Sequence, residues 1–285
     1  MTKKSIIIGT LVLTVVVMFG FISKIFRGDK SETPTDKQSN LVLGMALLND
    51  IPKIDFKRIV GELQSKYNLT VTGQDFDEEK GIGVIQLKGS QIAIGLMNIP
   101  IPGDELKFPS QISYLWPDAK DLTPKHKGHI IISVTSTGDS KLNLYKTFTK
   151  AAASVLTNTN AFGIYLGNQT LVLPTDFYVA GANSMTDEDL PLMNWIYFGL
   201  RDEDGKNSGY TFGLKEFGFD EMEILNSNHS KEEIHDILFN LSHYVIQSDV
   251  TLKDGETVGL TEEQKLKLTK SKGAQLEGTT LKVEY

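Results

Sequence analysis

The segment Lys125-His126-Lys127-Gly128-His129-Ile130-Ile131-Ile132-Ser133-Val134 carries the strongest strand signal outside the first thirty residues of the chain. Its three isoleucines and its valine are β-branched, and such side chains pack well on a pleated, buried strand. A similar order of expected elements lies on either side of this strand. The segment therefore predicts the junction between two related halves of a fold.

The residues before this junction predict the order strand, helix, strand, strand. An apolar run at 41–48 indicates the first strand, and Asp55 can cap the helix that follows. Two apolar runs at 82–87 and 91–96 flank Gly89-Ser90, a pair typical of a hairpin turn. One face of the helix is apolar at helical spacing, through Phe56, Ile59, Val60, Leu63 and Tyr67.

The junction strand and the residues after it repeat that order of elements. A turn is expected at Gly138-Asp139-Ser140, and a second hairpin at 162–166 and 170–173. The helix between them has an apolar face formed by Leu144, Phe148, Ala151, Ala152 and Val155. The order of elements repeats, although the residues do not. Two units of this order predict an α+β fold with antiparallel or mixed sheets and helices on one face.

The last third of the chain predicts one long helix among several strands. Ser230 and Glu233 have the spacing of a capping box. The helix that they begin has an apolar stripe formed by Ile234, Ile237, Leu238, Leu241 and Val245. Residues 201–207 are expected to form a turn. Short apolar runs indicate strands at 194–200, 219–225, 250–252, 257–260, 266–268 and 280–283.

Composition excludes some classes of function and argues against others. The chain has 285 residues, 40% of them hydrophobic, and no cysteine, which excludes disulfides and thiolate chemistry. Residues 31–285 hold 24 Lys/Arg and 35 Asp/Glu, a formal net charge of −11. A domain with this net negative charge repels phosphate backbones, so we expect no nucleic-acid partner. Only Arg58 and Arg201 lie beyond residue 30, which also argues against nucleotide and sugar-phosphate chemistry.

The N-terminus predicts a single membrane span. The run from Ser5 to Ser23 contains no charged residue, and its 19 residues would extend roughly 28 Å as a helix, close to the apolar thickness of a bilayer. A cleaved signal peptide is the alternative, but no small-residue cleavage site follows. We expect residues 1–27 to anchor the chain, 28–40 to form a flexible tether, and 41–285 to form the α+β domain, with a candidate division at 41–124 and 125–285.

The distribution of basic residues favours the cytoplasmic face for the domain. Two lysines precede the span, whereas four basic residues follow it, namely Lys24, Arg27, Lys30 and Lys37. The positive-inside rule places the more basic flank in the cytoplasm. The short basic N-terminal tail, which would then have to cross the membrane, argues for the opposite orientation.

The histidines and the acidic turn do not predict a metal site. His126 and His129 lead into a strand, where side chains three residues apart point to opposite faces. Joint ligation would need an irregular backbone at Gly128, so we expect a structural or solvated pair. The sequence Asp202-Glu203-Asp204-Gly205-Lys206-Asn207 resembles the start of a calcium loop. Its twelfth position is Gly213 instead of the required glutamate, which favours a solvated hairpin turn.

One pair of carboxylates suggests a catalytic alternative. Glu221 and Glu223 are two residues apart on an expected strand, so they face the same side. Paired carboxylates can perform acid–base catalysis. A hydrolase site would gather His129, Tyr210, Glu221 and Glu223. A strand with one solvated face explains the pair equally well, and no nucleophile elbow, phosphate-binding loop or cofactor motif accompanies it.

An ordered set of short motifs resembles a known family. The motifs are Pro100-Ile101-Pro102, Leu115-Trp116-Pro117, His126-Lys127-Gly128-His129-Ile130-Ile131, Gly163-Ile164-Tyr165, Leu190-Pro191, Trp195, Tyr210-Thr211-Phe212-Gly213, Phe217-Gly218, Glu221-Met222-Glu223 and Asp254-Gly255-Glu256-Thr257-Val258-Gly259. In this order they resemble the bacterial family catalogued as domain of unknown function 4261, over residues 41–285. The resemblance implies no reaction, ligand or catalytic residue, and the predicted span departs from the family pattern.

Taken together, the sequence predicts a membrane-tethered, non-catalytic binding module without a cofactor. Its acidic character suits capture of a basic protein, as an inhibitor or immunity-type module would do. The acidic loop Asp187-Glu188-Asp189 and the turn Asp202-Glu203-Asp204 are the expected contacts, with Trp116 or Tyr210 as aromatic anchors. The candidate binding residues are Trp116, His129, Asp187, Glu188, Asp189, Tyr210, Glu221 and Glu223.

Overall fold

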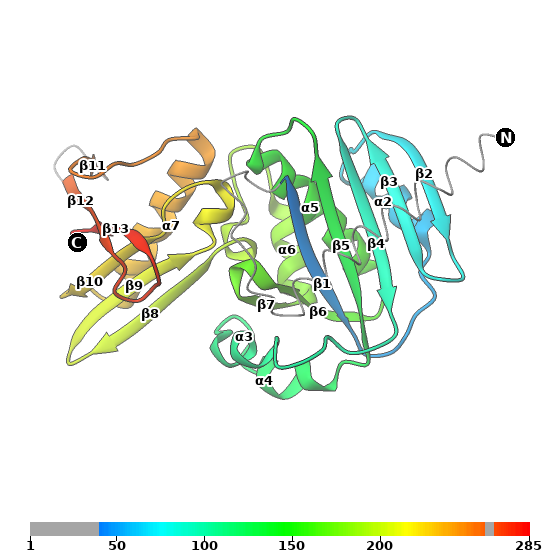
Figure 1. The fold of residues 1–285 in the computed structure, drawn as a ribbon, viewed down its shortest axis with the longest axis horizontal. Helices are drawn as coiled ribbons and strands as arrows, with labels where there is room; N and C mark the ends of the chain where they lie inside the picture. Colours follow the sequence, from blue (N-terminus) through cyan, green and yellow to red (C-terminus); the bar gives the residue numbers. More distant parts are fainter. Residues whose placement is uncertain (1–39, 260–264) are drawn as a thin grey trace.

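Two β-sheets, one covered by several helices and the other by a single long helix, make up the part of the chain that the structure describes, residues 40–259 and 265–285 of a computed structural model (Figure 1). The predicted anchor and, apart from Asn40, the predicted tether lie outside the described residues. Among the helices within 40–259 and 265–285, none is both long enough and apolar enough to cross a bilayer.

The larger sheet has seven strands in the order β2-β3-β4-β5-β1-β6-β7, and every neighbouring pair is antiparallel. Its strands are β1 (Leu41–Leu48), β2 (Val71–Asp77), β3 (Ile82–Leu87), β4 (Ser90–Met97), β5 (Gly128–Ser136), β6 (Ala161–Leu166) and β7 (Leu171–Pro174). The segment with three isoleucines and a valine at 130–134 forms β5, in the middle of this sheet.

The two predicted halves interlace within that sheet. Strand β1 lies between β5 and β6, so that Ala46 is opposite Ile130 on one side and Ile164 on the other. Strand β5 in turn separates β1 from β4. Strands from 41–124 and from 125–174 therefore share one sheet, whereas the strands of 197–285 form another.

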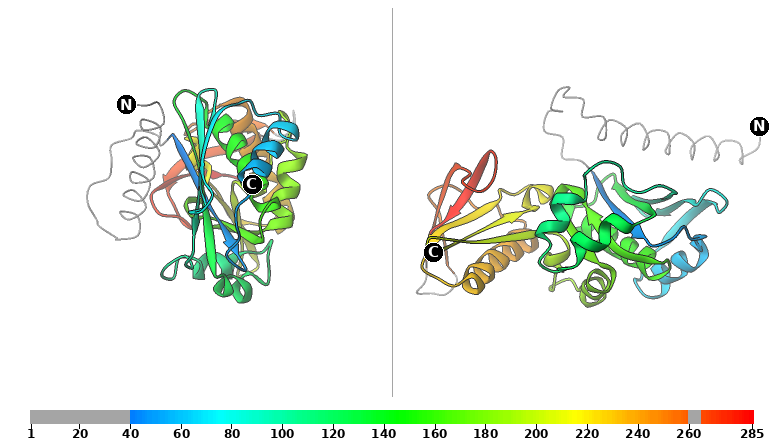
Figure 2. Two further views of the ribbon diagram at one scale, coloured as in Figure 1. Left: turned by 90° about the vertical axis from the view of Figure 1, so that its right-hand side faces the viewer. Right: turned by 90° about the horizontal axis from the view of Figure 1, so that it is seen from below.

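The long helices of this part pack on one face of the large sheet. These helices are α2 (Phe56–Ser65), α5 (Lys141–Thr157) and α6 (Thr175–Ser184), and the left view of Figure 2 shows them on one side of it. The alternation of the strands separates two cores. Ile130 and Ile132 belong to the main core with α5, while Ile131 belongs to a smaller core with Trp116. That second core is closed by α3 (Lys107–Ile112) and α4 (Ala119–Leu122).

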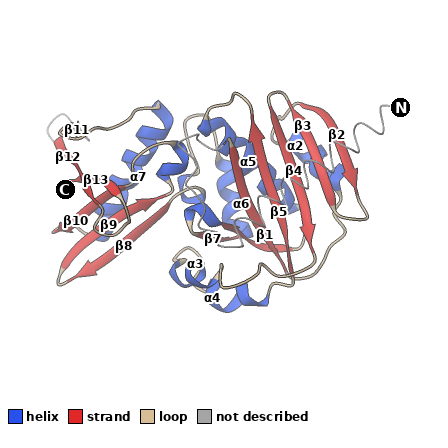
Figure 3. Ribbon diagram, in the orientation of Figure 1, coloured by secondary structure: helices blue, strands red, loops and turns tan. Residues whose placement is uncertain are grey.

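The smaller sheet is mixed and has the order β11-β12-β13-β10-β9-β8. Its strands are β8 (Tyr197–Glu203), β9 (Lys206–Phe212), β10 (Met222–Ser227), β11 (Thr257–Gly259), β12 (Lys265–Lys272) and β13 (Thr279–Val283). Only β10 and β13 pair in parallel. Helix α7 (Lys231–Ser248) covers one face (Figure 3), beginning at the predicted capping box of Ser230 and Glu233. The α+β class is thereby confirmed.

Some predicted elements differ from those in the structure. The turn expected at 201–207 is a tight hairpin whose two loop residues, Asp204 and Gly205, have positive φ angles of 53° and 78°. Asp204 thus adopts the left-handed conformation that two-residue hairpin loops require, and the flanking residues extend β8 and β9. Strands β2 and β9 and helix α6 were not predicted, and residues 250–252 are not a strand.

An aromatic cluster joins the two sheets into one packed unit. The ring centroid of Tyr145 on α5 lies 4.3 Å from that of Phe217, in the turn before β10, and 5.9 Å from that of Trp195. The indole N–H of Trp195 donates to Thr149 Oγ1 over 2.8 Å. Because both Trp195 and Tyr145 are fully buried, the two sheets share a core instead of meeting across solvent.

Candidate functional site

His126 is a structural cross-link between two loops. Its Nδ1–H donates to the carbonyl oxygen of Thr123 over 2.6 Å, and its Nε2 accepts from the backbone N–H of Ile101 over 2.7 Å. These partners fix a neutral ring with the proton on Nδ1. Burial lowers the pKa of His126, which keeps the ring in this neutral form.

His129 is held by the same stretch of chain. Its Nδ1–H donates to the carbonyl oxygen of Ile99 over 3.0 Å, and the side chain is buried on the face of β5 that carries Ile131. Burial lowers the pKa of His129 to about 4, although the bond to Ile99 opposes this effect. The ring is therefore neutral near pH 7, and both histidines fasten residues 99–101 to the start of β5.

Glu221 is buried and organises the turn after β9. Its Oε1 accepts from the backbone N–H groups of Gly213 (2.8 Å) and Lys215 (3.1 Å), and its Oε2 accepts from the hydroxyl of Thr211 (2.8 Å). Burial raises the pKa of Glu221, and these three donors act in the opposite direction. The carboxylate thus serves as a cap for the short helical turn at 214–217.

Glu223 organises a second loop in the same way. Its side chain is 0% exposed and accepts from the backbone N–H groups of Ala274, Gln275 and Leu276. The hydroxyl of Thr280 (2.8 Å) and the ammonium of Lys282 (2.7 Å) complete its shell. Burial alone would raise the pKa of Glu223, but Lys282 and the backbone donors lower it overall. Both oxygens are therefore occupied by donors from the β12–β13 connection.

A row of tyrosines runs along the face of the small sheet that α7 does not cover. The ring centroid of Tyr197 lies 5.8 Å from that of Tyr114 and 6.1 Å from that of Tyr210. The Arg201 guanidinium lies 6.0 Å from the Tyr210 ring centroid. Tyr114 is 46% exposed, and Tyr197 and Tyr210 are half-buried. Partly exposed tyrosines next to arginine are characteristic of binding surfaces.

The predicted acidic contacts lie in two separate places. Asp202 and Asp204 are exposed at the tip of the β8–β9 hairpin, the same hairpin that carries Tyr210. The loop at 187–189 lies between α5 and α7 instead. There Lys146 pairs with the Asp187 carboxylate over 3.0 Å, and the α7 side chain of Gln247 donates to the Asp187 carbonyl.

Trp116 is packed inside the smaller core. It is 8% exposed and meets Phe162 edge to face, with ring centroids 5.8 Å apart. It also lies directly over Gly163, where an added Cβ would stand 2.5 Å from the indole. In this position its ring closes the core under α3 and α4, on the other side of the large sheet from α5.

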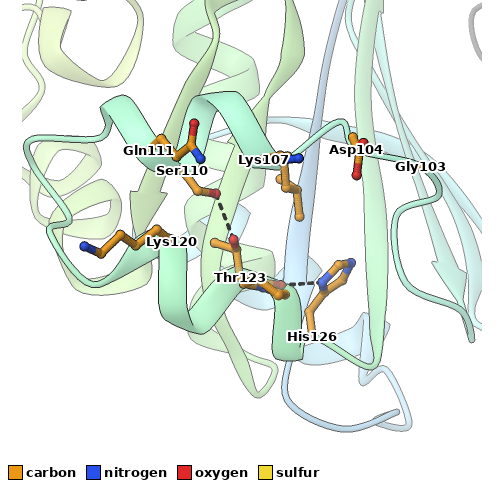
Figure 4. A pocket seen from close by; sticks show the side chains of 10 residues that line it. Gly103, Asp104, Lys107, Ser110, Gln111, Lys120, Thr123 and His126 are labelled. Atoms are coloured by element: carbon orange, nitrogen blue, oxygen red, sulfur yellow. Dashed lines mark hydrogen bonds between the residues drawn. The ribbon is translucent and has the colours of Figure 1, made fainter.

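A polar cleft that the sequence did not indicate opens between α3, α4 and the turn that follows (Figure 4). Its volume is about 390 Å³, within the usual range for small-molecule pockets. Ser110 and Thr123 face each other across its floor, with their hydroxyl oxygens 2.8 Å apart. Lys107 and Asp104 line one wall. Residues 108–124 lack periodicity, which left no sequence signal for these short helices.

The structure brings together only part of the predicted set. Tyr210 and Glu223 are opposite each other on β9 and β10, and Tyr210 shares its hairpin with the acidic tip. His129 and Trp116 belong to the large sheet and its second core. The acidic loop at 187–189 lies on the helical side, against α7.

Comparison with known proteins finds a similarity in the C-terminal segment. Residues 210–284, from β9 to β13, match the family model described as Domain of unknown function (DUF4261). The match confirms the predicted resemblance over this segment, which includes Tyr210, Glu221 and Glu223. No curated protein and no solved structure matches the chain.

Proposed function

We propose that the chain is a membrane-tethered, non-catalytic binding module that captures a basic protein. The observation that carries this proposal is the β8–β9 hairpin, which combines an exposed acidic tip with the tyrosine row. Charged groups at the rim steer association, whereas partly buried aromatic rings supply affinity. The hairpin offers both in one continuous element.

The charge distribution also favours the part of the chain that carries the β8–β9 hairpin as the binding region. Residues 197–285 hold 17 Asp/Glu and 10 Lys/Arg, a formal net charge of −7. Most of the acidic excess of residues 31–285 thus lies in this segment of the sequence. A field of this sign raises the local concentration of basic partners and speeds their association.

The hydrolase alternative would need a site near His129, Tyr210, Glu221 and Glu223. Glu221 and Glu223 already accept hydrogen bonds from backbone, hydroxyl and ammonium donors. A general base needs a carboxylate within reach of a substrate proton. Their occupied oxygens, and the place of His129 in the other sheet, favour the binding proposal.

The membrane part of the proposal rests on the uncharged run from Ser5 to Ser23, with the domain on the cytoplasmic face. Removal of residues 1–27 should release the chain from membranes. The α+β domain should then remain folded in solution, because no strand or helix of the described fold precedes residue 41. A truncated chain that aggregates at every salt concentration would contradict this expectation.

The binding proposal can be tested by affinity capture from host extract with the full chain in mild detergent. Asp202→Asn with Asp204→Asn should weaken capture of a basic protein and reduce its dependence on salt. Tyr210→Ala should weaken capture at every salt concentration. The predicted loop is tested by changing Asp187, Glu188 and Asp189 to Asn, Gln and Asn. Glu232→Gln with Asp236→Asn removes equal charge from α7 and serves as the matched control.

Capture that survives the hairpin variants unchanged and shows no salt dependence would refute the acidic hairpin as the contact. Loss of capture in the 187–189 variant alone would place the contact on the helical side of the molecule instead. Equal losses of capture in the hairpin variants and in the α7 control would show that net charge alone, and not the hairpin, governs binding.

A further inference from the structure

The outer half of strand β8 presents an open edge of the small sheet, whereas in the inner half the backbone of Phe198 is hydrogen bonded to Tyr114. Strand β8 is the outermost strand of that sheet, with β9 on one side only (Figure 1). In a two-residue hairpin the residues flanking the loop are hydrogen bonded to each other. Because Glu203 pairs with Lys206, the backbones of Tyr197, Gly199 and Arg201 also point toward β9.

The alternate residues of β8 consequently point their backbone groups outward. These are Leu200 and Asp202 in the outer half of the strand. Within residues 40–259 and 265–285, no protein group is hydrogen bonded to the outward N–H or carbonyl of either residue. Unpaired groups of this kind can pair with an added strand.

The other edges of the two sheets are protected. Strand β2 contains a register shift between Val71 and Gly73, and bulges of this kind discourage pairing. Strand β7 has four residues and ends at Pro174, and the hydroxyl of Ser113 occupies its Val172 carbonyl. Strand β11 has three residues. Strand β8 has seven, with neither proline nor bulge.

We propose that the partner binds by adding an extended, basic strand to the outer edge of β8. This inference rests on the proposed function and specifies its mode, β-strand addition. The added strand would pair with the backbones of Leu200 and Asp202. Its basic side chains would lie near the acidic tip, and its side chains on the open face would lie beside Tyr197 and Tyr210.

Charge selects a foreign strand over a second copy of this chain. Pairing β8 with β8 of another copy would bring together two regions that each carry a formal net charge of −7 and would place both acidic tips at the shared edge. Like charges disfavour that arrangement. A lysine-rich strand removes the repulsion and uses the same backbone groups.

The probe is a synthetic peptide of four Lys-Val repeats with blocked ends, titrated into the full chain. A second peptide has the same sequence with every backbone nitrogen N-methylated, so its charge is unchanged but neither of its edges can donate a backbone hydrogen bond. On the protein, Leu200→Pro removes one outward N–H, and proline is tolerated on an edge strand where the N–H faces solvent. Leu200→Ala loses the same side chain and keeps the N–H, which makes it the matched control.

Strand addition predicts that the plain peptide binds at least about tenfold more tightly than its N-methylated form, since several backbone bonds are lost together. Leu200→Pro should lose most of that difference, whereas Leu200→Ala should retain it. Amide exchange at Leu200 and Asp202 should also slow on binding. If Leu200→Pro fails to fold, the two peptides and the exchange measurement still decide.

Equal binding of both peptides, with sensitivity to Asp202→Asn and Asp204→Asn, would overturn strand addition and leave the acidic capture surface intact. Binding of neither peptide would overturn strand addition, and affinity capture would then judge the proposed function separately. A dimer in sedimentation that Leu200→Pro alone dissociates would assign the edge to a second copy and refute the foreign strand.

Discussion

The two sheets of this protein are held together by different means. The large sheet is covered by three helices on one face and two short ones on the other, and the polar side chains buried around it, two histidines among them, are neutral. The small sheet has only α7 and relies on two buried carboxylates, Glu221 and Glu223, to hold its loops. Helix α7 cannot fix the connections on the face of the small sheet that it does not cover. The buried carboxylates of Glu221 and Glu223 hold those connections instead. We expect the large sheet to respond mainly to packing and the small sheet mainly to charge.

The largest effect that tests this difference is expected from Glu223→Ala. The change leaves Lys282 without its buried partner and frees three backbone N–H groups, and breaking such a pair typically costs about 3–5 kcal/mol. Chemical denaturation should show this loss in the free energy of unfolding. Glu284→Ala, which breaks an exposed pair with Lys267, should cost less than about 1 kcal/mol. Similar losses in both variants would contradict the role given to Glu223.

A cavity under α7 tests whether the two sheets unfold together. Leu241 is 2% exposed on the covered side of α7, so Leu241→Ala should cost about 2–5 kcal/mol. Because Tyr145, Trp195 and Phe217 join the sheets, we expect one transition that different probes report alike. A loss below about 0.5 kcal/mol would remove Leu241 from the core. Two separate transitions would show that the aromatic joint does not couple the sheets.

On acidification, His129 of the large sheet should lower the stability of the whole protein before Glu223 of the small sheet does. His129 has a pKa of about 4 in the folded protein against about 6.5 when unfolded, so the unfolded state binds the proton first. Stability should fall by about 3 kcal/mol as pH drops from about 6.5 to 4. The lowered pKa of Glu223 acts in the same direction only below about 4.5, where the carboxylate of the unfolded state binds a proton before that of the folded state does. His129→Gln should flatten the first phase in pH-dependent denaturation. An unchanged profile would exclude His129 as its source.

The smallest expected effect is that of the hairpin tip. Asp202→Asn with Asp204→Asn changes exposed side chains with no ion pair among the described residues, so the free energy of unfolding should move by less than about 0.5 kcal/mol. Thermal denaturation beside the capture experiment measures this directly. A loss above about 1 kcal/mol would mean that any lost binding reflects a damaged hairpin rather than lost contacts.

The sequence predicted the elements whose periodicity is set by burial. The apolar runs of β1 and β5, the faces of α2, α5 and α7, and the capping box at Ser230 all follow from side chains that must be covered. Strand β2 was missed because Val71–Asp77 has no buried residue and its polar side chains conceal the alternation. The hairpin turn was expected over 201–207, but strand β9 was missed, because the tight turn at Asp204-Gly205 lies within a charged run that also suits a longer loop.

The candidate site was less accessible to sequence reasoning than the fold. The spacing of Glu221 and Glu223 correctly places them near each other, but it cannot tell whether their oxygens meet water or backbone donors. Those donors come from residues up to 53 positions away in the chain, at Leu276. The edge status of β8 likewise depends on the order of all six strands, which no local pattern encodes.

The interlaced sheet also determines how long β1 must wait for its partner strands while the chain is synthesised. Strand β1 ends at Leu48, but both of its neighbours lie beyond it, with the nearer one starting at Gly128. At about 5–20 residues per second, a ribosome needs between about 4 and 16 s to make that stretch. During this interval an apolar strand has left the ribosome without either partner. Nascent chains of this protein should therefore depend on holding factors until β5 and β6 emerge.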